Sequence, residues 1–156
     1  MKKLSQQLVT TFRAKKLILA LAESMTCGLA AHQLSGCIGT SEVLKGSIVC
    51  YTPEMKCQVM QIKENMIKKY TCESKEVTEA LVKNLSKLIK ADVYAAITGL
   101  ASPGGTETKD KPVGTVFFSV RKGKIVRNYH HVFRGTPLEI KKKACLKLFE
   151  LILSSI

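Results

Sequence analysis

Two clusters of small polar residues directly follow apolar runs, and they are the strongest candidates for chemistry in the sequence. The first reads "ESMTCG" over residues 23–28, after the run "LILALA". The second reads "TGLASPGG" over residues 98–105, after "VYAAI". Because the carboxyl ends of strands form the functional edge of an α/β sheet, we expect both clusters to lie at one edge.

Ser24 in the first cluster is a candidate nucleophile, and helix capping is the competing interpretation. Residues 28–34 have helical spacing, so Ser24 and Thr26 precede a helix start. Free amides and the positive end of a helix dipole suit a phosphate, a carboxylate or an oxyanion. Serine is also a preferred N-cap, and the residues alone favour capping. The G-x-S-x-G nucleophile elbow is absent, which argues against an α/β-hydrolase.

A serine nucleophile needs a base, and none of the three histidines suits that role. His32 falls within the helix that follows the cluster, and His130 and His131 fall within a strand. A lysine can act as the base where burial favours its uncharged form. Lys56 follows a strand end on the first turn of a helix. A solvated surface lysine is the alternative for Lys56 unless something links it to Ser24.

The second cluster is rich in glycine and can let a backbone approach a ligand closely. It contains Thr98, Gly99, Gly104 and Gly105. An irregular surface connection explains the same composition. No G-K-[ST] follows, so the segment is not a Walker loop.

The elements that must position these residues alternate between strands and helices. Helices are predicted over residues 4–14, 28–34, 53–60, 64–70, 74–88 and 138–153, and strands over 16–23, 43–51, 91–100, 113–120 and 125–133. The last two strands flank a tight turn at Lys122–Gly123. This order predicts an α/β fold: a three-layer α/β/α sandwich with a mixed, mostly parallel sheet ending in a β-hairpin. We expect a single domain over residues 1–156.

Composition favours a globular protein with a real core. Apolar residues make up 46% of the chain and charged residues 24%. The run "LILALA" is far shorter than the roughly 20 residues that span a bilayer, and no leader is recognisable. We therefore expect a cytoplasmic protein with no membrane partner. The six cysteines show no C-x-x-C or zinc-type spacing, so we expect reduced packing residues and no metal site.

The formal net charge of +13 raises the possibility of a nucleic-acid partner. The basic residues are spread along the chain, and aromatic residues make up only 6%. No DNA- or RNA-binding motif is present, so nucleic acid is the least favoured partner. A solvated basic surface that attracts anionic substrates is the favoured interpretation.

Several spaced motifs, in one order, resemble the carboxy-terminal domain family of the competence-damage-inducible protein CinA. The family patterns A-E-S-C-T-G-G, G-G-V-V-A-Y-S-N-E-x-K and V-S-E-E-V correspond to "AESMTCG", "KGSIVCYTPEMK" and "CESKEV". The later patterns T-G-I-A-G-P-G-G, K-P-V-G-T-V and F-x-G-D-R-x-x-I-R correspond to "TGLASPGGTETKDKPVGTV" and "FRGTPLEIK". The resemblance runs from about Leu17 to Leu148. The same domain occurs alone as nicotinamide mononucleotide deamidase, the PncC type.

The resemblance implies an amidohydrolase of NAD salvage that uses no metal and no cofactor. It would convert nicotinamide mononucleotide and water to nicotinic acid mononucleotide and ammonia, with Ser24 as nucleophile and Lys56 as base. The matched positions imply a substrate-binding set of Glu23, Thr26, Cys27, Gly28, Tyr51, Thr98, Gly99, Gly104 and Gly105. Within it we expect the amides of residues 26–28 to hold the oxyanion, residues 98–105 to hold the ribose phosphate, and Tyr51 to shape the nicotinamide pocket. The resemblance also implies a homo-oligomer.

The chain departs from the family pattern at several positions near this expected site. Met25, Cys27, Pro53 and Ser102 replace cysteine, glycine, asparagine and glycine, and Thr136–Pro137 replaces the late aspartate–arginine pair. An arginine at 137 would suit a phosphate or carboxylate, and Arg134 or Lys141 are the candidates to replace it. A catalytically silent or substrate-altered nucleotide-binding homologue is therefore the alternative function.

Overall fold

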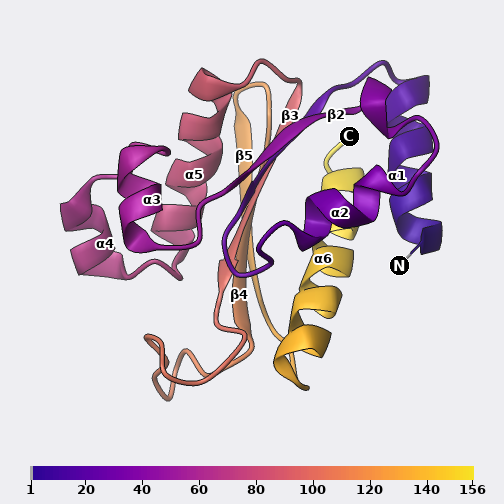
Figure 1. The fold of residues 1–156 in the computed structure, drawn as a ribbon. Helices are drawn as coiled ribbons and strands as arrows, with labels where there is room; N and C mark the ends of the chain where they lie inside the picture. The colour runs from indigo at the N-terminus through magenta and orange to yellow at the C-terminus, as the bar shows by residue number, and fades with distance from the viewer. Residues whose placement is uncertain (1) are drawn as a thin grey trace.

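A five-stranded mixed sheet forms the centre of the molecule (Figure 1). The computed structural model describes residues 2–156. The strands are β1 (Leu19–Glu23), β2 (Leu44–Val49), β3 (Val93–Gly99), β4 (Thr115–Lys122) and β5 (Ile125–Val132), in the spatial order β2-β1-β3-β4-β5. β1 is parallel to both β2 and β3, and β4 is antiparallel to both β3 and β5. Four strands therefore run in one direction and β4 runs in the other, which confirms the predicted mixed sheet with a terminal hairpin.

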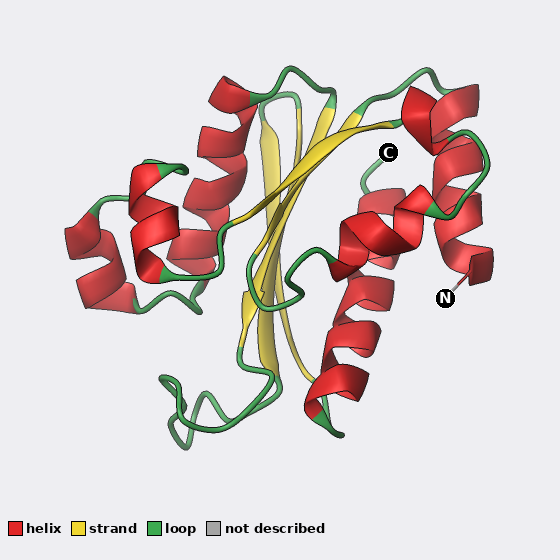
Figure 2. Ribbon diagram, viewed as in Figure 1, coloured by secondary structure: helices red, strands yellow, loops and turns green. Residues whose placement is uncertain are grey.

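Helices cover both faces of the sheet, as the predicted α/β/α layering requires (Figure 2). One face carries α1 (Lys2–Ala14), α2 (Leu29–Ser35) and α6 (Pro137–Leu153), and the other carries α3 (Pro53–Gln58), α4 (Glu64–Tyr70) and α5 (Lys75–Leu88). A short 3₁₀ helix, η1 (Thr40–Glu42), precedes β2. Across residues 2–156, no helix combines the length and apolar character needed to cross a membrane.

The central strand β1 is buried on both faces because helices pack on each side. Its side chains alternate between the faces. Leu19 and Leu21 join the core beneath α1, α2 and α6. Ala20 and Ala22 join the second core cluster, beneath α5. A strand that is buried on both faces reads as a continuous apolar run, which is why "LILALA" predicts β1 well.

Side-chain caps fix the starts of the longer helices near the site. The Ser74 hydroxyl accepts a hydrogen bond from the Val77 amide at 3.2 Å, so the predicted cap of α5 is confirmed. Thr136 and Glu139 form a reciprocal capping box at the start of α6. Pro137 occupies the first turn of that helix, where its missing N–H costs nothing.

Element boundaries differ from the predicted ones by a few residues. α3 ends at Gln58 rather than at residue 60, and Met60 is packed in the core beyond the helix. β2 ends at Val49, because the chain turns into the cap of α3 at Thr52. The predicted turn of the β4–β5 hairpin is confirmed, with Gly123 in the left-handed region at φ 59°. All six cysteines are free, as expected.

Candidate active site

Ser24 lies directly beyond the carboxyl end of β1, where the sheet holds its backbone. Its amide donates to the Ile97 carbonyl of β3 at 3.1 Å, which extends the β1–β3 ladder by one residue. The residue is 4% exposed. Ser24 is not a helix cap, because α2 begins at Leu29 and its N-cap is Gly28 at φ 89°. The capping interpretation of Ser24 is therefore wrong.

Lys56 is fully buried, and its amine reaches the Ser24 hydroxyl. The Nζ atom lies 3.0 Å from Ser24 Oγ, 2.8 Å from the Cys50 carbonyl oxygen and 3.1 Å from the Tyr51 carbonyl oxygen. The solvated-lysine alternative is wrong, since the exposed fraction of Lys56 is 0%. Two hydrogen bonds fix the position of Lys56 relative to Ser24. The Thr52 hydroxyl caps the helix that carries Lys56, and the Cys50 amide donates to the Glu23 carbonyl at 2.8 Å.

The Lys56 amine makes no ion pair within 4 Å among residues 2–156. Among residues 2–156, the ion pairs within 4 Å involve other lysines and arginines. Burial raises the pKa of the Cys50 thiol, although the nearby Lys56 opposes that shift. Burial likewise raises the pKa of Cys72, so both thiols stay protonated and neutral at pH 7. The Lys56 amine is therefore surrounded by uncharged hydrogen-bond partners.

Three oxygen atoms surround the Lys56 amine at hydrogen-bond distance. A neutral lysine amine has two N–H donors and one lone pair. The Cys50 and Tyr51 carbonyls accept two N–H groups. The third neighbour is Ser24 Oγ at 3.0 Å, to which Lys56 Nζ donates; an amine that has lost its proton would instead accept the hydroxyl proton there. This arrangement is that of a nucleophile beside its base.

Glu23 organises the turn after β1 from inside the protein. Its carboxylate is fully buried and accepts hydrogen bonds from the Thr26 and Ser47 hydroxyls at 2.7 and 3.0 Å. It also accepts the amides of Gly28, Ala30 and Ala31 at 2.9–3.1 Å, and so caps α2 from the preceding strand. Glu23 therefore faces the protein interior.

Internal hydrogen bonds leave only some of the backbone amides near Ser24 free to bind a ligand. The Cys27 amide donates to the Ser24 carbonyl, and the Gly28 amide donates to Glu23. The expectation that all amides of residues 26–28 hold an oxyanion is thus wrong for Cys27 and Gly28. Within the described chain, the amides of Met25 and Thr26 have no hydrogen-bond partner. Met25 immediately follows Ser24, the position that supplies an oxyanion donor in nucleophile turns.

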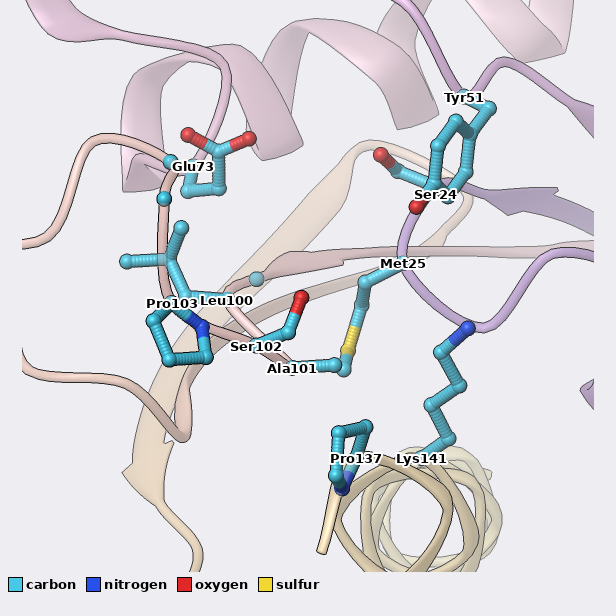
Figure 3. A pocket seen from close by; sticks show the side chains of 13 residues that line it. Ser24, Met25, Tyr51, Glu73, Leu100, Ala101, Ser102, Pro103, Pro137 and Lys141 are labelled. Atoms are coloured by element: carbon cyan, nitrogen blue, oxygen red, sulfur yellow. The ribbon is translucent and has the colours of Figure 1, made fainter.

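A pocket of about 280 Å³ opens beside Ser24 (Figure 3). This volume is near the lower end of the roughly 300–1,000 Å³ of small-molecule sites. The lining combines the turn after β1, the segment after β2, the segment before α5, the end of β3 with the loop that follows it, and the start of α6: Ser24, Met25, Tyr51, Glu73, Gly99 to Gly105, Pro137 and Lys141. The two polar clusters of the sequence therefore do meet at one edge of the sheet.

Not all of the predicted site residues reach this pocket. Ser24, Tyr51, Gly99, Gly104 and Gly105 line it. Glu23, Thr26, Cys27, Gly28, Lys56 and Thr98 are absent from the lining, and Lys56 is linked to it through its contact with Ser24 Oγ.

The expected phosphate contacts in the second cluster are already used within the protein. Thr98 is fully buried, and its hydroxyl is paired with that of Thr78 at 2.8 Å. The amides of Gly104 and Gly105 donate to the Glu107 carboxylate at 2.7 and 2.8 Å. The Gly104 amide holds the pKa of Glu107 below its ordinary value, so the carboxylate stays charged in this loop. A carboxylate thus already occupies the donors that we expected for a ribose phosphate.

The sequence did not predict Glu73 as a pocket residue. It offered Lys141 and Arg134 as alternative replacements for the family's late arginine. Glu73 precedes the capping serine of α5, a position that predicts surface structure rather than a site. Lys141 lines the pocket, whereas Arg134 does not. Helical spacing explains why Lys141 reaches the pocket and Arg134 does not. Lys141 lies one turn after Pro137 on α6, on the same side of the helix, whereas Arg134 precedes the helix. No group of three or more metal-ligating side chains occurs among residues 2–156.

Comparisons with known proteins agree with the motifs. The CinA C-terminal domain family matches residues 1–156. A CinA-like protein of Prochlorococcus marinus is 36% identical over 159 residues, covering 97% of this chain and 36% of that protein. A CinA-like protein of Thermotoga neapolitana is 37% identical over 119 residues, covering 76% of this chain and 29% of that protein. The chain thus spans about a third of the length of these relatives.

Solved structures share the fold. The crystal structure of a competence-damaged protein (CinA) superfamily protein from Escherichia coli superimposes with a TM-score of 0.93 at 24% identity, covering 99% of this chain and 90% of that one. The family match over the full sequence and the fold agree. The chain belongs to the CinA C-terminal domain family.

Proposed function

We propose that the chain is an amidohydrolase that converts the carboxamide of nicotinamide mononucleotide to a carboxylate and releases ammonia. One observation carries the proposal: a fully buried lysine amine lies 3.0 Å from the hydroxyl of a serine that lines a pocket. In this mechanism the Lys56 amine acts in its uncharged, basic form. A serine with such a neighbour is suited to attack an amide.

In the first step, Ser24 Oγ bonds to the carboxamide carbon while Lys56 Nζ takes the hydroxyl proton. Negative charge then develops on the carbonyl oxygen. The free amide of Met25, which lines the pocket, is the donor available for that charge. Its position is set by the turn that the Glu23 carboxylate holds, so it needs no rearrangement during the reaction.

In the second step, Lys56 returns the proton to the departing nitrogen, the carbon–nitrogen bond breaks and ammonia leaves. The product acid is then esterified to Ser24. Water attacks this ester, with Lys56 again accepting a proton and passing it to Ser24 Oγ. The acid leaves and the serine is regenerated, so one water is consumed for each ammonia released.

Family membership and pocket size support nicotinamide mononucleotide as the substrate. Tyr51 is 57% exposed at the pocket, where its ring offers a surface for a flat aromatic ligand. Lys141 provides a positive charge for a phosphate. Location in the cytoplasm and self-association belong to the same proposal.

A nucleotide-binding protein without turnover is the second candidate, and the loop after β3 favours it. The amides of Gly104 and Gly105 are taken by Glu107, and Pro137 lines the pocket where the family pattern has arginine. Both features weaken the binding of a phosphate. They leave the Ser24–Lys56 pair intact, and for that reason we favour the enzyme.

Ammonia release from nicotinamide mononucleotide, measured beside nicotinamide and glutamine, tests the proposal. We expect ammonia and nicotinic acid mononucleotide in equal amounts from the nucleotide, and little ammonia from the other two amides. Calorimetric binding of the nucleotide without ammonia release would support the second candidate instead. Absence of both binding and hydrolysis across a broad panel of amides would reject both functions.

A further inference from the structure

Glu73 places a carboxylate in the wall of the pocket. It is the one acidic residue among those that line the site, and it lies in the segment between α4 and α5. Its Oε2 atom accepts a hydrogen bond from the Thr106 hydroxyl at 2.7 Å. No ion pair within 4 Å among residues 2–156 includes Glu73, so its charge is available to a ligand.

Lys111 fixes this wall without neutralising it directly. Its Nζ atom donates to the Thr71 hydroxyl at 2.7 Å, the Thr106 hydroxyl at 2.9 Å and the Glu73 carbonyl at 3.3 Å. These bonds tie the loop after β3 to the segment before α5. The ammonium is one hydroxyl removed from the Glu73 carboxylate, so it offsets part of that charge while it holds the carboxylate in place.

Lys141 is the one cationic side chain in the same lining, and it lies across the pocket from Glu73 (Figure 3). Figure 3 shows Glu73 on one side, Lys141 on the opposite side, and Ser24 beside Tyr51. The remaining lining residues carry no charge. The pocket therefore has a negative wall and a positive wall, and a ligand that spans it meets both.

We propose that Glu73 is a specificity residue that selects amides with a positive charge close to the carboxamide, such as a pyridinium ring. This inference rests on the proposed function. A neutral ligand that closes over Glu73 removes water from the carboxylate without replacing it, which is unfavourable. A cationic ring replaces the lost hydration of the carboxylate by a favourable charge interaction. Lys141 interacts with the negatively charged end of the same ligand.

A matched pair of ligands isolates the charge of the ring. Nicotinamide mononucleotide carries a pyridinium cation, and its reduced 1,4-dihydro form is neutral with the same carboxamide and phosphate. Binding of both is measured by calorimetry at pH 8 in a Ser24→Ala background, where no turnover occurs. We expect the cationic form to bind about tenfold tighter, the size of effect that one partly solvated charge pair supplies.

The test variant is Glu73→Gln and the matched control is Glu76→Gln, both in the Ser24→Ala background. Glu76 is an exposed glutamate on the first turn of α5, outside the pocket lining. We expect Glu73→Gln to reduce the preference for the cationic form to less than about twofold, mainly by weakening the binding of that form. We expect Glu76→Gln to keep the preference.

Three results would overturn the inference. They are equal affinity of the parent for both forms, an unchanged preference in Glu73→Gln, and no binding of either form. Ammonia release by the protein with Ser24 intact reports separately on the proposed function. Charge-selective binding without ammonia release would reject the proposed enzyme activity and support the role of Glu73. Ammonia release without charge selectivity would support the enzyme activity and reject the role of Glu73.

Discussion

Replacing Lys56 with methionine removes the proposed base and keeps most of the side chain's shape. Methionine has a similar unbranched length, so the buried volume is nearly retained. The amine that lies 3.0 Å from Ser24 Oγ is lost. A positioned general base contributes about 10²–10⁴ to the rate, so we expect kcat/KM to fall by that factor, or roughly 3–5 kcal/mol in activation free energy.

The folded state should tolerate this substitution better than the reaction does. The carbonyls of Cys50 and Tyr51 lose a donor, at a cost of about 1–3 kcal/mol for each acceptor left unsatisfied. The substitution also removes the cost of burying the amine, which offsets part of that loss. We expect a net loss of about 2 kcal/mol or less in the free energy of unfolding.

Two measurements separate these effects. Ammonia release is followed in a coupled assay at saturating and limiting substrate, and stability is followed by urea unfolding. Lys68→Met, which alters an exposed lysine on α4, is the matched control and should change neither. If Lys56→Met stays folded and retains kcat/KM within about twofold, Lys56 is not the base, because a base contributes far more.

Two other substitutions test the supporting structure. Glu23→Gln replaces one acceptor oxygen of a buried carboxylate by an NH₂ group that faces N–H donors. We expect the free energy of unfolding, measured with urea, to fall by about 2–4 kcal/mol. A fall of less than about 0.5 kcal/mol would contradict the role of Glu23. The side chains of Lys83 first, and then Asn128, hold the pKa of Glu79 below its ordinary 4.5. The contribution of Glu79 is therefore complete above pH 4.5 and is lost as the pH falls through the lowered pKa. We expect Glu79→Gln to reduce stability at pH 7 by less than about 1 kcal/mol, and we expect this deficit to shrink steadily as the pH falls below 4.5; a deficit that does not change on acidification would contradict this origin.

The elements of the fold are predictable because each depends on local patterns. The 3.6-residue spacing from Val77 to Leu88 marks α5, and Ser74 marks its start, as the structure confirms. The two-sided burial of β1 leaves a continuous apolar run. The ends of α3 and β2 differ from the predicted ones because they depend on where the chain turns away from the sheet. The local sequence pattern does not encode that point.

The site was harder to predict because its contacts join distant segments. Ser24 and Lys56 are 32 residues apart, and only the family motifs linked them. The capping of α2 by Glu23 was missed because the carboxylate approaches from the preceding strand, not from the usual N-cap position. The bonds from Gly104 and Gly105 to Glu107 form within a loop whose composition alone does not specify a conformation.

Ammonia release from nicotinamide mononucleotide by Ser24→Ala, compared with Ser102→Ala, tests the central claim most directly. Ser102 lines the same pocket and serves as the control hydroxyl. We expect Ser24→Ala to lose at least about 10³-fold in kcat, whereas Ser102→Ala stays within about tenfold of the wild type. Turnover by Ser24→Ala at close to the wild-type rate would contradict it.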